Sequence, residues 1–513
     1  MWNRLTGGAK FFIILLVVGG IAAAFYFLKP DAFEKKPGSS SSSTSSSLGG
    51  LFSSKDADIT LGVNTWSGFA PIVWMNKGLE PNKDSRLYKQ FGIKLRIKIL
   101  DVFDDSRNNF KSGNLNTVYC TTDVLPIEMG AGSGMVEAGA EQFLQVDWSR
   151  GGDAIVVSKG INTVADLKGK TISVAEGTAS HSLLIKVLES NGLSMTDVKM
   201  KKVADGIESA KLYKAGAVDA AVVWSPDDLD CVSAVSGTKV LVNTKVATHI
   251  IADGILARKD FINNSRDLLI KFASAWLEAN SEINKSDDVA KEAANAFATA
   301  FNVSADFAYN GIKNVRLTTL GDNKDFFGLN PNYLGMTGEQ LYSKMSVVYG
   351  DLGLAKNSIA WRSVSNTSII EAITLTADQG SEAEVKFTPV TAEVKNKPAI
   401  SNKKVTINFE TNSSSLSDFA KSTIDKEIVN IAKSFGSARV RIEGNTDAVG
   451  SNDYNKVLSL KRAQSVAWYL TKEYKWDPNR FIVIGNGMAR ALNDGVSGDN
   501  EAYRRTDFEL VEE

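Results

Sequence analysis

An acid and a base near the C-terminus stand where one ligand could bridge them. Asp447 lies in a glycine-flanked turn after a predicted strand at residues 438–443. Arg462 lies on the predicted helix that follows, on the same face as Asn455, because positions i and i+7 share one face of an α-helix. A carboxylate binds an ammonium group and a guanidinium binds a carboxylate. The pair could therefore hold both ends of a zwitterion, and the spacing predicts that both side chains face one solvent-side groove.

This segment resembles the OmpA-like peptidoglycan-binding family over residues 402–511. In that family the acid and the helix arginine hold the ammonium and the carboxylate of diaminopimelate in the wall peptide. The resemblance therefore implies peptidoglycan as a partner and a site made of Asp447, Arg462, Asn445, Thr446 and Asn455. It rests on three motifs in the family's order, which are Gly444-x-Thr446-Asp447-x-x-Gly450, Tyr454-Asn455-x-x-Leu458-Ser459-x-x-Arg462-Ala463 and Arg504-Arg505.

Two positions depart from the family pattern. Asn445 stands where a His is common, and Tyr503 stands where an Asn usually precedes the arginine pair. Asn keeps its hydrogen-bonding capacity, whereas the change at Tyr503 leaves the role of Arg504 open. The alternative interpretation of Asp447 and Arg462 is an ordinary surface ion pair, which contributes little to stability.

The N-terminal residues predict a membrane anchor. Residues 11–28 are uncharged and mostly apolar, and as a helix they would extend about 27 Å, enough to cross the hydrocarbon core of a bilayer. A cleaved signal peptide is the alternative, because the small residues 22–24 resemble a cleavage site. We favour an uncleaved signal anchor, since the apolar run continues to Leu28. Residues 1–10 would then be cytoplasmic.

The rest of the chain has the composition of a globular protein of more than one domain. Of its 513 residues 43% are apolar and 23% charged, and the net charge is −1. With no basic block, nucleic acid is not an expected partner. The Ser-rich residues 29–57 predict a flexible tether. Residues 376–401 predict a second linker, with a strand at 383–387, before a C-terminal domain at 402–513.

Residues 58–375 alternate short apolar strands with amphipathic helices, the pattern of an α/β domain with largely parallel sheets. Its strands are predicted at residues 59–63, 95–100, 118–122, 170–175, 203–204, 220–223 and 254–258. The C-terminal domain predicts a small β-α-β-α-β sheet, covered on one side, with strands at 405–409, 438–443, 481–485 and 507–511 and a first helix at 417–435. The overall fold class is therefore α/β, followed by a small α+β domain.

The clearest local chemistry in the middle of the chain is a join between a strand and a helix. The strand runs into Gly177, and Thr178 can cap the helix that follows. Backbone N–H groups at a helix start form a ready anion site. Most such joins need a cap and bind nothing, so the join alone is weak evidence for a ligand.

This region resembles the periplasmic substrate-binding proteins of the nitrate/sulfonate/taurine type over most of residues 59–375. The resemblance rests on Trp66-Ser67-Gly68, on Asp166-Leu167-Lys168-Gly169-Lys170, on the Gly-Thr helix start and on residues 215–226. It implies two lobes that close over a small solute, with an ABC permease as partner. The implied ligand-binding positions are Trp66, Ser67, Gly68, Thr121, Thr122, Asp123, Thr178, Ala179, Ser180, Trp224 and Ser225. We expect an anionic or sulfonate-like solute, held between residues 177–180 and 66–68.

The remaining reactive residues do not form a catalytic or metal pattern. His181 and His249 share no metal-ligand spacing, and Glu128 and Asp253 are isolated acids in the sequence. Cys120 and Cys231 belong to segments expected in different lobes, so we predict two separate thiols. We expect no cofactor and no metal. An enzyme of the pyrimidine-precursor type is disfavoured, because the His and Cys cluster expected for it is missing.

Together these patterns predict a non-enzymatic, single-pass inner-membrane protein whose bulk lies in the periplasm. It would capture a small solute for an ABC-type importer while its C-terminal domain binds the wall. The alternative is a structural or sensory scaffold that links the inner membrane to the wall, with a repurposed binding domain.

Overall fold

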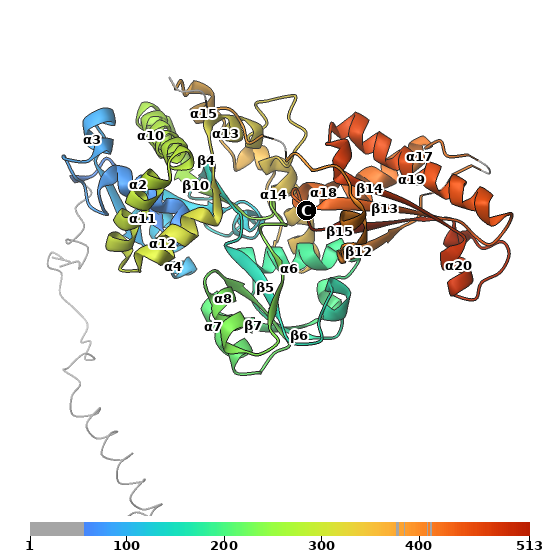
Figure 1. The fold of residues 1–513 in the computed structure, drawn as a ribbon. Helices are drawn as coiled ribbons and strands as arrows, with labels where there is room; N and C mark the ends of the chain where they lie inside the picture. Colours follow the sequence, from blue (N-terminus) through green and yellow to red (C-terminus); the bar gives the residue numbers. More distant parts are fainter. Residues whose placement is uncertain (1–55, 376–378, 384, 408, 411–412) are drawn as a thin grey trace, which may run out of the picture. The chain divides into compact units, whose positions relative to one another are not determined.

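The computed structural model describes residues 56–513, except 376–378, 384, 408 and 411–412 (Figure 1). The predicted membrane segment at residues 11–28 and nearly all of the Ser-rich tether lie outside the described residues. Among the helices of the described part, none is both long and apolar enough to cross a bilayer. The described chain contains three sheets, two in the middle region and one in the C-terminal domain.

The first lobe is built on a six-stranded sheet in the order β11-β4-β10-β3-β1-β2. Its strands are β1 (Ile59–Val63), β2 (Leu95–Ile99), β3 (Thr117–Thr121), β4 (Ala140–Ser149), β10 (Ala252–Arg258) and β11 (Val315–Leu317). Its helices are α2 (Ala70–Asn76), α3 (Arg86–Phe91), α4 (Phe103–Lys111), α5 (Leu125–Glu128), α9 (Lys259–Asn264), α10 (Arg266–Lys285), α11 (Asp287–Phe301), α12 (Ala305–Lys313), α13 (Leu320–Phe326), α14 (Gly338–Asp351) and α15 (Ser368–Ala372). Phe272 and Trp276 on α10 are fully buried in its core.

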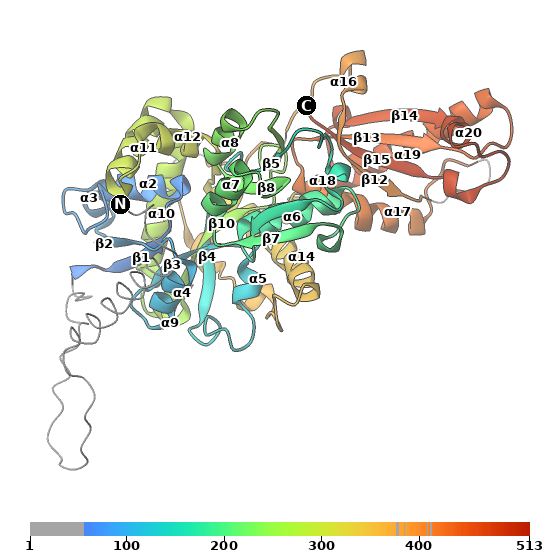
Figure 2. The ribbon, with the colours of Figure 1, turned by 90° about the horizontal axis from the view of Figure 1, so that it is seen from below.

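The second lobe is a five-stranded sheet with helices on both faces (Figure 2). The sheet has the order β7-β6-β8-β5-β9, from β5 (Asp153–Val157), β6 (Thr171–Ala175), β7 (Lys199–Val203), β8 (Ala220–Trp224) and β9 (Lys239–Asn243). Alternate strand residues point to opposite faces. Val174 and Val222 therefore pack with Leu183 of α6 (Ala179–Ser190), while Val156 packs with Tyr213 of α7 (Gly206–Lys214) and with α8 (Asp227–Ala234).

The chain crosses between the lobes twice, and this corrects the expectation of largely parallel sheets. Residues 150–152 lead from β4 to β5, and residues 244–251 lead from β9 back to β10. β1, β2 and β3 are parallel, as are β6, β7 and β8, but β10 and β5 pair antiparallel with their neighbours. A strand that enters from the other lobe runs against the strands that the local helices connect. The two-lobed α/β architecture itself is confirmed.

The C-terminal domain has a four-stranded sheet in the order β12-β15-β13-β14. Its elements are β12 (Ala399–Val405), α17 (Asp418–Ile424), a π-helical stretch (Asp425–Val429), α18 (Asn430–Ser434), β13 (Arg439–Asn445), α19 (Asn452–Tyr474), β14 (Phe481–Gly487), α20 (Ala489–Asn493) and β15 (Thr506–Val511). The strand predicted at 405–409 is wrong, because the strand ends at Val405 and pairs with β15 through the earlier residues. The strand predicted at 383–387 does not form among the described residues there, and α16 (Ala392–Asn396) occupies part of the predicted linker.

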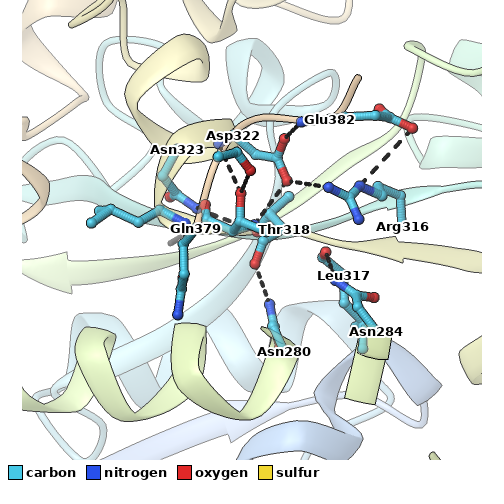
Figure 3. Close-up of polar contacts among 12 residues, drawn as sticks. Asn280, Asn284, Arg316, Leu317, Thr318, Asp322, Asn323, Gln379 and Glu382 are labelled. Atoms are coloured by element: carbon cyan, nitrogen blue, oxygen red, sulfur yellow. Dashed lines mark hydrogen bonds and ion pairs between the residues drawn. The ribbon is translucent and has the colours of Figure 1, made fainter. Parts of the chain in front are cut away.

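The beginning of the predicted linker is bound to the first lobe. Gln379 accepts hydrogen bonds from the backbone of α13, with its side chain on Leu320 N and its carbonyl on Gly321 N. The backbone N–H of Glu382 donates to Asp322 Oδ1 at 2.5 Å, and Asp322 also pairs with Arg316 at 3.0 Å (Figure 3). These bonds fix residues 379–382 against the start of α13, so a free linker can begin only after them.

Two glycines let α19 approach the sheet of the C-terminal domain closely. A Cβ at Gly444 in β13 would overlap the carbonyl oxygen of Ser459, and one at Gly485 in β14 would lie 2.6 Å from Leu460 N. The apolar side of α19, which includes Ala463 and Val466, is buried here. The sequence therefore permits a helix-to-sheet distance that any larger residue would prevent.

Gly444→Ala should lower the stability of the C-terminal domain by about 1–3 kcal/mol, the usual cost of overpacking. The rigid partner is backbone, so it cannot rotate away. Gly350→Ala is the matched control, because Gly350 is exposed near the end of α14 and a Cβ there has room. It should be neutral or stabilising by up to about 1 kcal/mol. Denaturant unfolding followed by circular dichroism measures both, and equal effects would contradict the close packing.

Candidate functional site

The Trp66-Ser67-Gly68 turn lies where the two lobes meet. Trp66 precedes a short 3-10 helix (Ser67–Phe69), and its Nε1 donates to Asp147 Oδ2 at 3.3 Å. A Cβ at Gly68 would overlap that same carboxylate, and one at Gly152 would overlap the Trp66 ring. The turn therefore needs Gly68 because Asp147 fills the space below it, and the Trp66 ring lies against the first crossing segment.

Ser67, the middle residue of the turn, does not face the junction. It is buried, and its hydroxyl lies against Gly311 of α12, where a side chain would collide with it. The three predicted residues at the end of β3 also differ in their surroundings. Thr121 is half-buried at the strand end, Thr122 Oγ1 donates to Gln142 Oε1 at 3.0 Å, and the carboxyl group of Asp123 is fully buried.

The start of α6 differs from the predicted capped anion site. Thr178 is the N-cap residue, but its hydroxyl donates to Ala175 O at 2.8 Å and accepts no hydrogen bond from the helix. Ala179 is half-buried, and Ser180 Oγ accepts a hydrogen bond from Trp224 Nε1 at 3.0 Å. Ser225 contacts the other lobe, because its hydroxyl accepts from Asn314 Nδ2 at 3.3 Å. Trp224 therefore meets the helix start as expected, whereas Thr178 bonds back to its own strand.

Four buried aspartates meet at the junction, and only Asp123 among them was predicted as a site residue. Asp147 in β4 and Asp253 in β10 are direct partners in the register of the two strands. Asp153 begins β5 and accepts a hydrogen bond from Ser149 Oγ at 2.8 Å. All four are less than 10% exposed. Asp253 is therefore not an isolated acid. Asp153 and Asp253 lie in otherwise apolar strands, which was the signal in the sequence, but only the fold shows that the four acids lie together.

Burial raises the pKa of each of these carboxyl groups. The pKa of Asp123 and that of Asp147 rise to about 7, and the pKa of Asp153 rises to about 6. Burial also raises the pKa of Asp253 well above its usual value, with the charges of Asp147 and Asp123 adding to the effect. A buried carboxylate is unfavourable unless a cation or hydrogen bonds compensate it. None of the four forms a salt bridge within the described residues, although Arg150 lowers the pKa of Asp147 through its charge.

The other titratable residues singled out by the sequence are accounted for structurally. Glu128 forms a two-pronged ion pair with Arg107 at 2.6 and 2.9 Å, so it is not isolated either. His181 Nδ1 accepts a hydrogen bond from Gly177 N, and burial lowers the pKa of His181 to about 4. Cys120 in β3 and Cys231 in α8 lie in different lobes as two free, buried thiols, as predicted.

In the C-terminal domain, Asp447 and Arg462 are neighbours but lie below the surface. They are only 8% and 6% exposed, which corrects the expected solvent-side groove. Arg462 Nε donates to Ser413 O at 3.1 Å and its Nη2 to Glu410 O at 3.4 Å, with the ring of Phe409 at 5.0 Å. Burial lowers the pKa of Arg462, while the nearby charge of Asp447 acts in the opposite direction.

Arg504, whose role the sequence left open, is the residue that binds Asp447. Its Nη1 lies 2.6 Å from Asp447 Oδ2 and also pairs with Asp499. Arg504 is more exposed than Asp447, with 38% of its side chain accessible. An arginine on the rim therefore holds the buried carboxylate at its outer side, and Arg462 lies beyond it.

The other three predicted residues shape the turn that carries Asp447. Asn445 Nδ2 donates to Glu443 O and to Asp507 Oδ2, and its Oδ1 accepts from Asn486. Thr446 N donates to Gly487 O at 2.9 Å, and Asn455 Nδ2 donates to Val449 O at 2.7 Å. Their hydrogen bonds hold the loop on which Asp447 lies.

Two family models match the chain. Residues 153–290 match the family described as NMT1/THI5 like, and residues 408–505 match the OmpA family. The chain joins an NMT1/THI5-like domain to an OmpA-family domain. The OmpA-family match begins just before the loop bound by Arg462 and ends at Arg505, so it contains the whole Asp447 site.

Curated relatives match one domain or the other. The OmpA-family domain is 32% identical over 129 residues to outer membrane protein Omp38 of Acinetobacter baumannii, covering 25% of this chain and 36% of that protein. It is 33% identical over 131 residues to outer membrane protein A of Bordetella avium, covering 24% and 65%. A putative aliphatic sulfonates-binding protein of Escherichia coli is 32% identical over 109 residues, covering 21% and 32%. The chain thus spans between about a third and two thirds of the length of these relatives.

Two similar solved structures are those of sulfonate-binding proteins, and another is that of the desulfurization enzyme DSZB, so the likeness indicates the fold alone. The periplasmic aliphatic sulphonate binding protein SsuA from Escherichia coli is 15% identical, with a TM-score of 0.48 over 65% of this chain and 97% of that one. The alkanesulfonate-binding protein SsuA from Xanthomonas axonopodis pv. citri, bound to MOPS, is also 15% identical, with a TM-score of 0.47 over 60% and 98%.

Proposed function

We propose that the OmpA-family domain binds the diaminopimelate of peptidoglycan through Asp447 and Arg462. The observation that supports this most directly is that Asp447 and Arg462 are each less than 10% exposed and lie close enough for the charge of Asp447 to act on the guanidinium of Arg462. Charge-assisted bonds are stronger away from water. In this arrangement Asp447 takes the ammonium group of the side chain of diaminopimelate, and Arg462 takes its carboxylate.

Arg504 would be displaced or shared when the ligand binds. It is bound to the same Asp447 oxygen that the ammonium needs, but it also pairs with Asp499 on the outside. A partly exposed arginine can move outward at little cost, since exposed ion pairs are weak. Arg504 would then keep the carboxylate of Asp447 oriented in the free protein.

The two-lobed domain would bind one small solute at the lobe junction, as a binding protein and not as an enzyme. Support comes from Trp66 and the four carboxyl groups, which come from both lobes and meet at the crossings. Two connections between lobes permit hinge closure around a ligand. The chain would be held at the inner membrane by its N-terminal segment, with the lobes in the periplasm, and would deliver its solute to an ABC permease.

The scaffold alternative keeps the wall-binding and anchoring roles but not the solute. It is favoured only if the lobe junction binds nothing, because the site proposed for the OmpA-family domain uses no residue of the lobes.

A comparison of two kinds of cell wall tests the proposed wall binding. Full-length protein in mild detergent should sediment with sacculi whose stem peptides contain diaminopimelate, and free diaminopimelate should release it. Sacculi with lysine in that position should retain little, because lysine has the ammonium group and lacks the carboxylate that Arg462 needs. Equal retention by both walls would contradict the assignment.

A further inference from the structure

We propose that the solute bound at the lobe junction is a small organic cation, held by Asp147 and Asp253 and covered by the Trp66 ring. This inference rests on the solute binding proposed above and replaces the anionic ligand expected from the sequence. The proposed ligand carries a primary ammonium or a similar donor group on a short apolar chain.

The first observation is the number of carboxyl groups that meet without a counter-ion. Asp123, Asp147, Asp153 and Asp253 come from the end of β3, from β4, from β5 and from β10. Asp147 and Asp253 interact directly through their side chains, and Asp153 and Asp123 act on Asp253 through their charges. The described part of the chain provides no ion pair to any of them. An anion placed here would meet carboxyl groups from both lobes, which repel it once they are ionised.

The second observation is that several of these oxygen atoms have no donor. Asp147 Oδ1 and both oxygens of Asp123 are buried without a partner at bonding distance. Ser182 Oγ faces Asp123 and shares a hydrogen bond of 2.7 Å with Tyr349 Oη, in which either hydroxyl can be the donor. When Tyr349 donates, Ser182 can donate to one oxygen of Asp123, which leaves the other oxygen open. Buried polar atoms are nearly always paired in folded proteins. A ligand with N–H donors would complete the acceptors that the protein leaves open.

The third observation concerns the shape of the site around Asp147. Trp66 Nε1 bonds Asp147 Oδ2, and its ring lies against Gly152, where the chain crosses to the second lobe. The Trp66 side chain is half-buried, so part of it stays accessible beside the carboxylate. An aromatic face next to a carboxylate suits an ammonium group, which is attracted by both. An apolar stem can lie along the ring.

The site fits an organic cation better than a metal ion. In the described residues no group of three or more His, Cys, Asp or Glu side chains converges as metal ligands. Ca²⁺ needs six to eight oxygen ligands at short distance, and Mg²⁺ needs an octahedron. An ammonium group needs fewer ligands, because it makes three hydrogen bonds, and the adjacent carboxylates of Asp147 and Asp253 can accept two of them.

Cation binding at this site should depend on pH. The ligand needs ionised carboxylates, so affinity should rise with pH and level off above about 7. The titratable and charged groups that face the four aspartates are few: Asp228 of α8, Arg150 of the first crossing, Tyr349 of α14 and Cys120 of β3. Burial keeps the tyrosine and the thiol neutral in this range, because it raises the pKa of both. Anion binding would show the opposite trend.

Titration calorimetry with four probes of equal chain length tests the inference. Full-length protein is titrated with butylammonium, 1,4-diaminobutane, butanesulfonate and 1-butanol at pH 5.5, 6.5 and 8.0. We expect the two amines to bind and the sulfonate and the alcohol not to bind. If one carboxylate of pKa about 7 must be ionised, affinity should rise about 30-fold between pH 5.5 and 8.0.

Two variants assign the binding to the aspartates. Asp147→Asn keeps the size of the side chain and should abolish amine binding, whereas Asp351→Asn, at the exposed end of α14, should leave it unchanged. Circular dichroism and the melting temperature confirm that each variant is folded. Amine binding that survives in Asp147→Asn would overturn the inference.

The remaining outcomes separate this inference from the function on which it rests. If butanesulfonate binds and the amines do not, solute binding stands and the cation assignment is wrong. If none of the probes binds, and a wider thermal-shift screen of amines, amino acids, sulfonates and nitrate also finds no ligand, both the cation and the solute-binding role fall, and the scaffold alternative is supported.

Discussion

Asp447→Asn should reduce the fraction of protein retained by diaminopimelate-containing sacculi at least about tenfold, and Arg462→Ala should do the same. Each substitution removes one of the two charges that read the zwitterion and leaves the other uncompensated in a site that is almost closed to water. Loss of one partner in a buried charge pair costs about 2–5 kcal/mol of binding free energy. Sedimentation of full-length protein with purified sacculi measures the effect.

Two further variants control this result. Asp418→Asn removes a fully exposed carboxylate from α17 and should leave sedimentation unchanged. Arg504→Ala should change binding less than either site substitution, because Arg504 binds Asp447 from the rim and the ligand's ammonium can replace it. If Asp447→Asn and Arg462→Ala both sediment like the wild type while remaining folded, the domain binds the wall through another surface.

Asp147→Asn should stabilise the ligand-free protein at neutral pH, although it removes a hydrogen-bonded side chain from the junction. A pKa of about 7 for Asp147, against about 3.9 in an unfolded chain, means that ionisation in the folded state costs about 4 kcal/mol. The contribution of Asp147 to the free energy of unfolding is therefore largest below about pH 4, where the side chain is protonated in both states. It falls as pH rises from 4 toward 7, and above about pH 7 it does not change further. The variant has no such loss, since Asn does not titrate.

The quantity to measure is the difference in melting temperature between Asp147→Asn and wild type from pH 4.5 to 8. It should increase by several degrees up to about pH 7 and then remain level. Taking the difference cancels His181, whose lowered pKa of about 4 acts in the opposite direction over the same range. It also cancels Asp287, whose pKa of about 2 matters only in acid. If the difference in melting temperature is constant with pH, burial does not raise the pKa of Asp147 in the folded protein.

Local patterns determined most of the secondary structure of the lobes. β1 and β8 are short apolar runs bounded by turn residues, and their predicted positions agree with the observed ones within about one residue. The strand predicted at residues 203–204 shares only Val203 with β7, and β4, β5, β9 and β11 were not predicted. β4 contains Glu141, Gln142, Gln145 and Asp147, all of which are buried. A strand that is buried on both faces yet carries polar residues lacks the alternation or the apolar run that identifies strands in a sequence.

The C-terminal site shows the same division at the level of single residues. Motif spacing selected Asp447 and Arg462 as one site, and their charges do interact in the fold, because strand, turn and helix are contiguous in the chain. It could not show that Arg504 would be the ion-pair partner of Asp447, because Arg504 lies much later in the chain, just before β15. The depth of the site was also beyond the sequence, since the segment that covers Arg462, around Glu410 and Ser413, precedes it by a whole helix and strand.

The sequence by itself determined the order of the parts, the two domain families, the strand–turn–helix unit that carries Asp447, and the turn at Trp66. Each of these depends on residues close together in the chain. Only the tertiary structure decided the charge of the lobe junction. Asp147, Asp153 and Asp253 lie on three strands of two sheets and Asp123 follows the end of β3, and they meet because the chain crosses between the lobes twice. Burial then changes their protonation, and burial is a property of the fold that no local pattern contains.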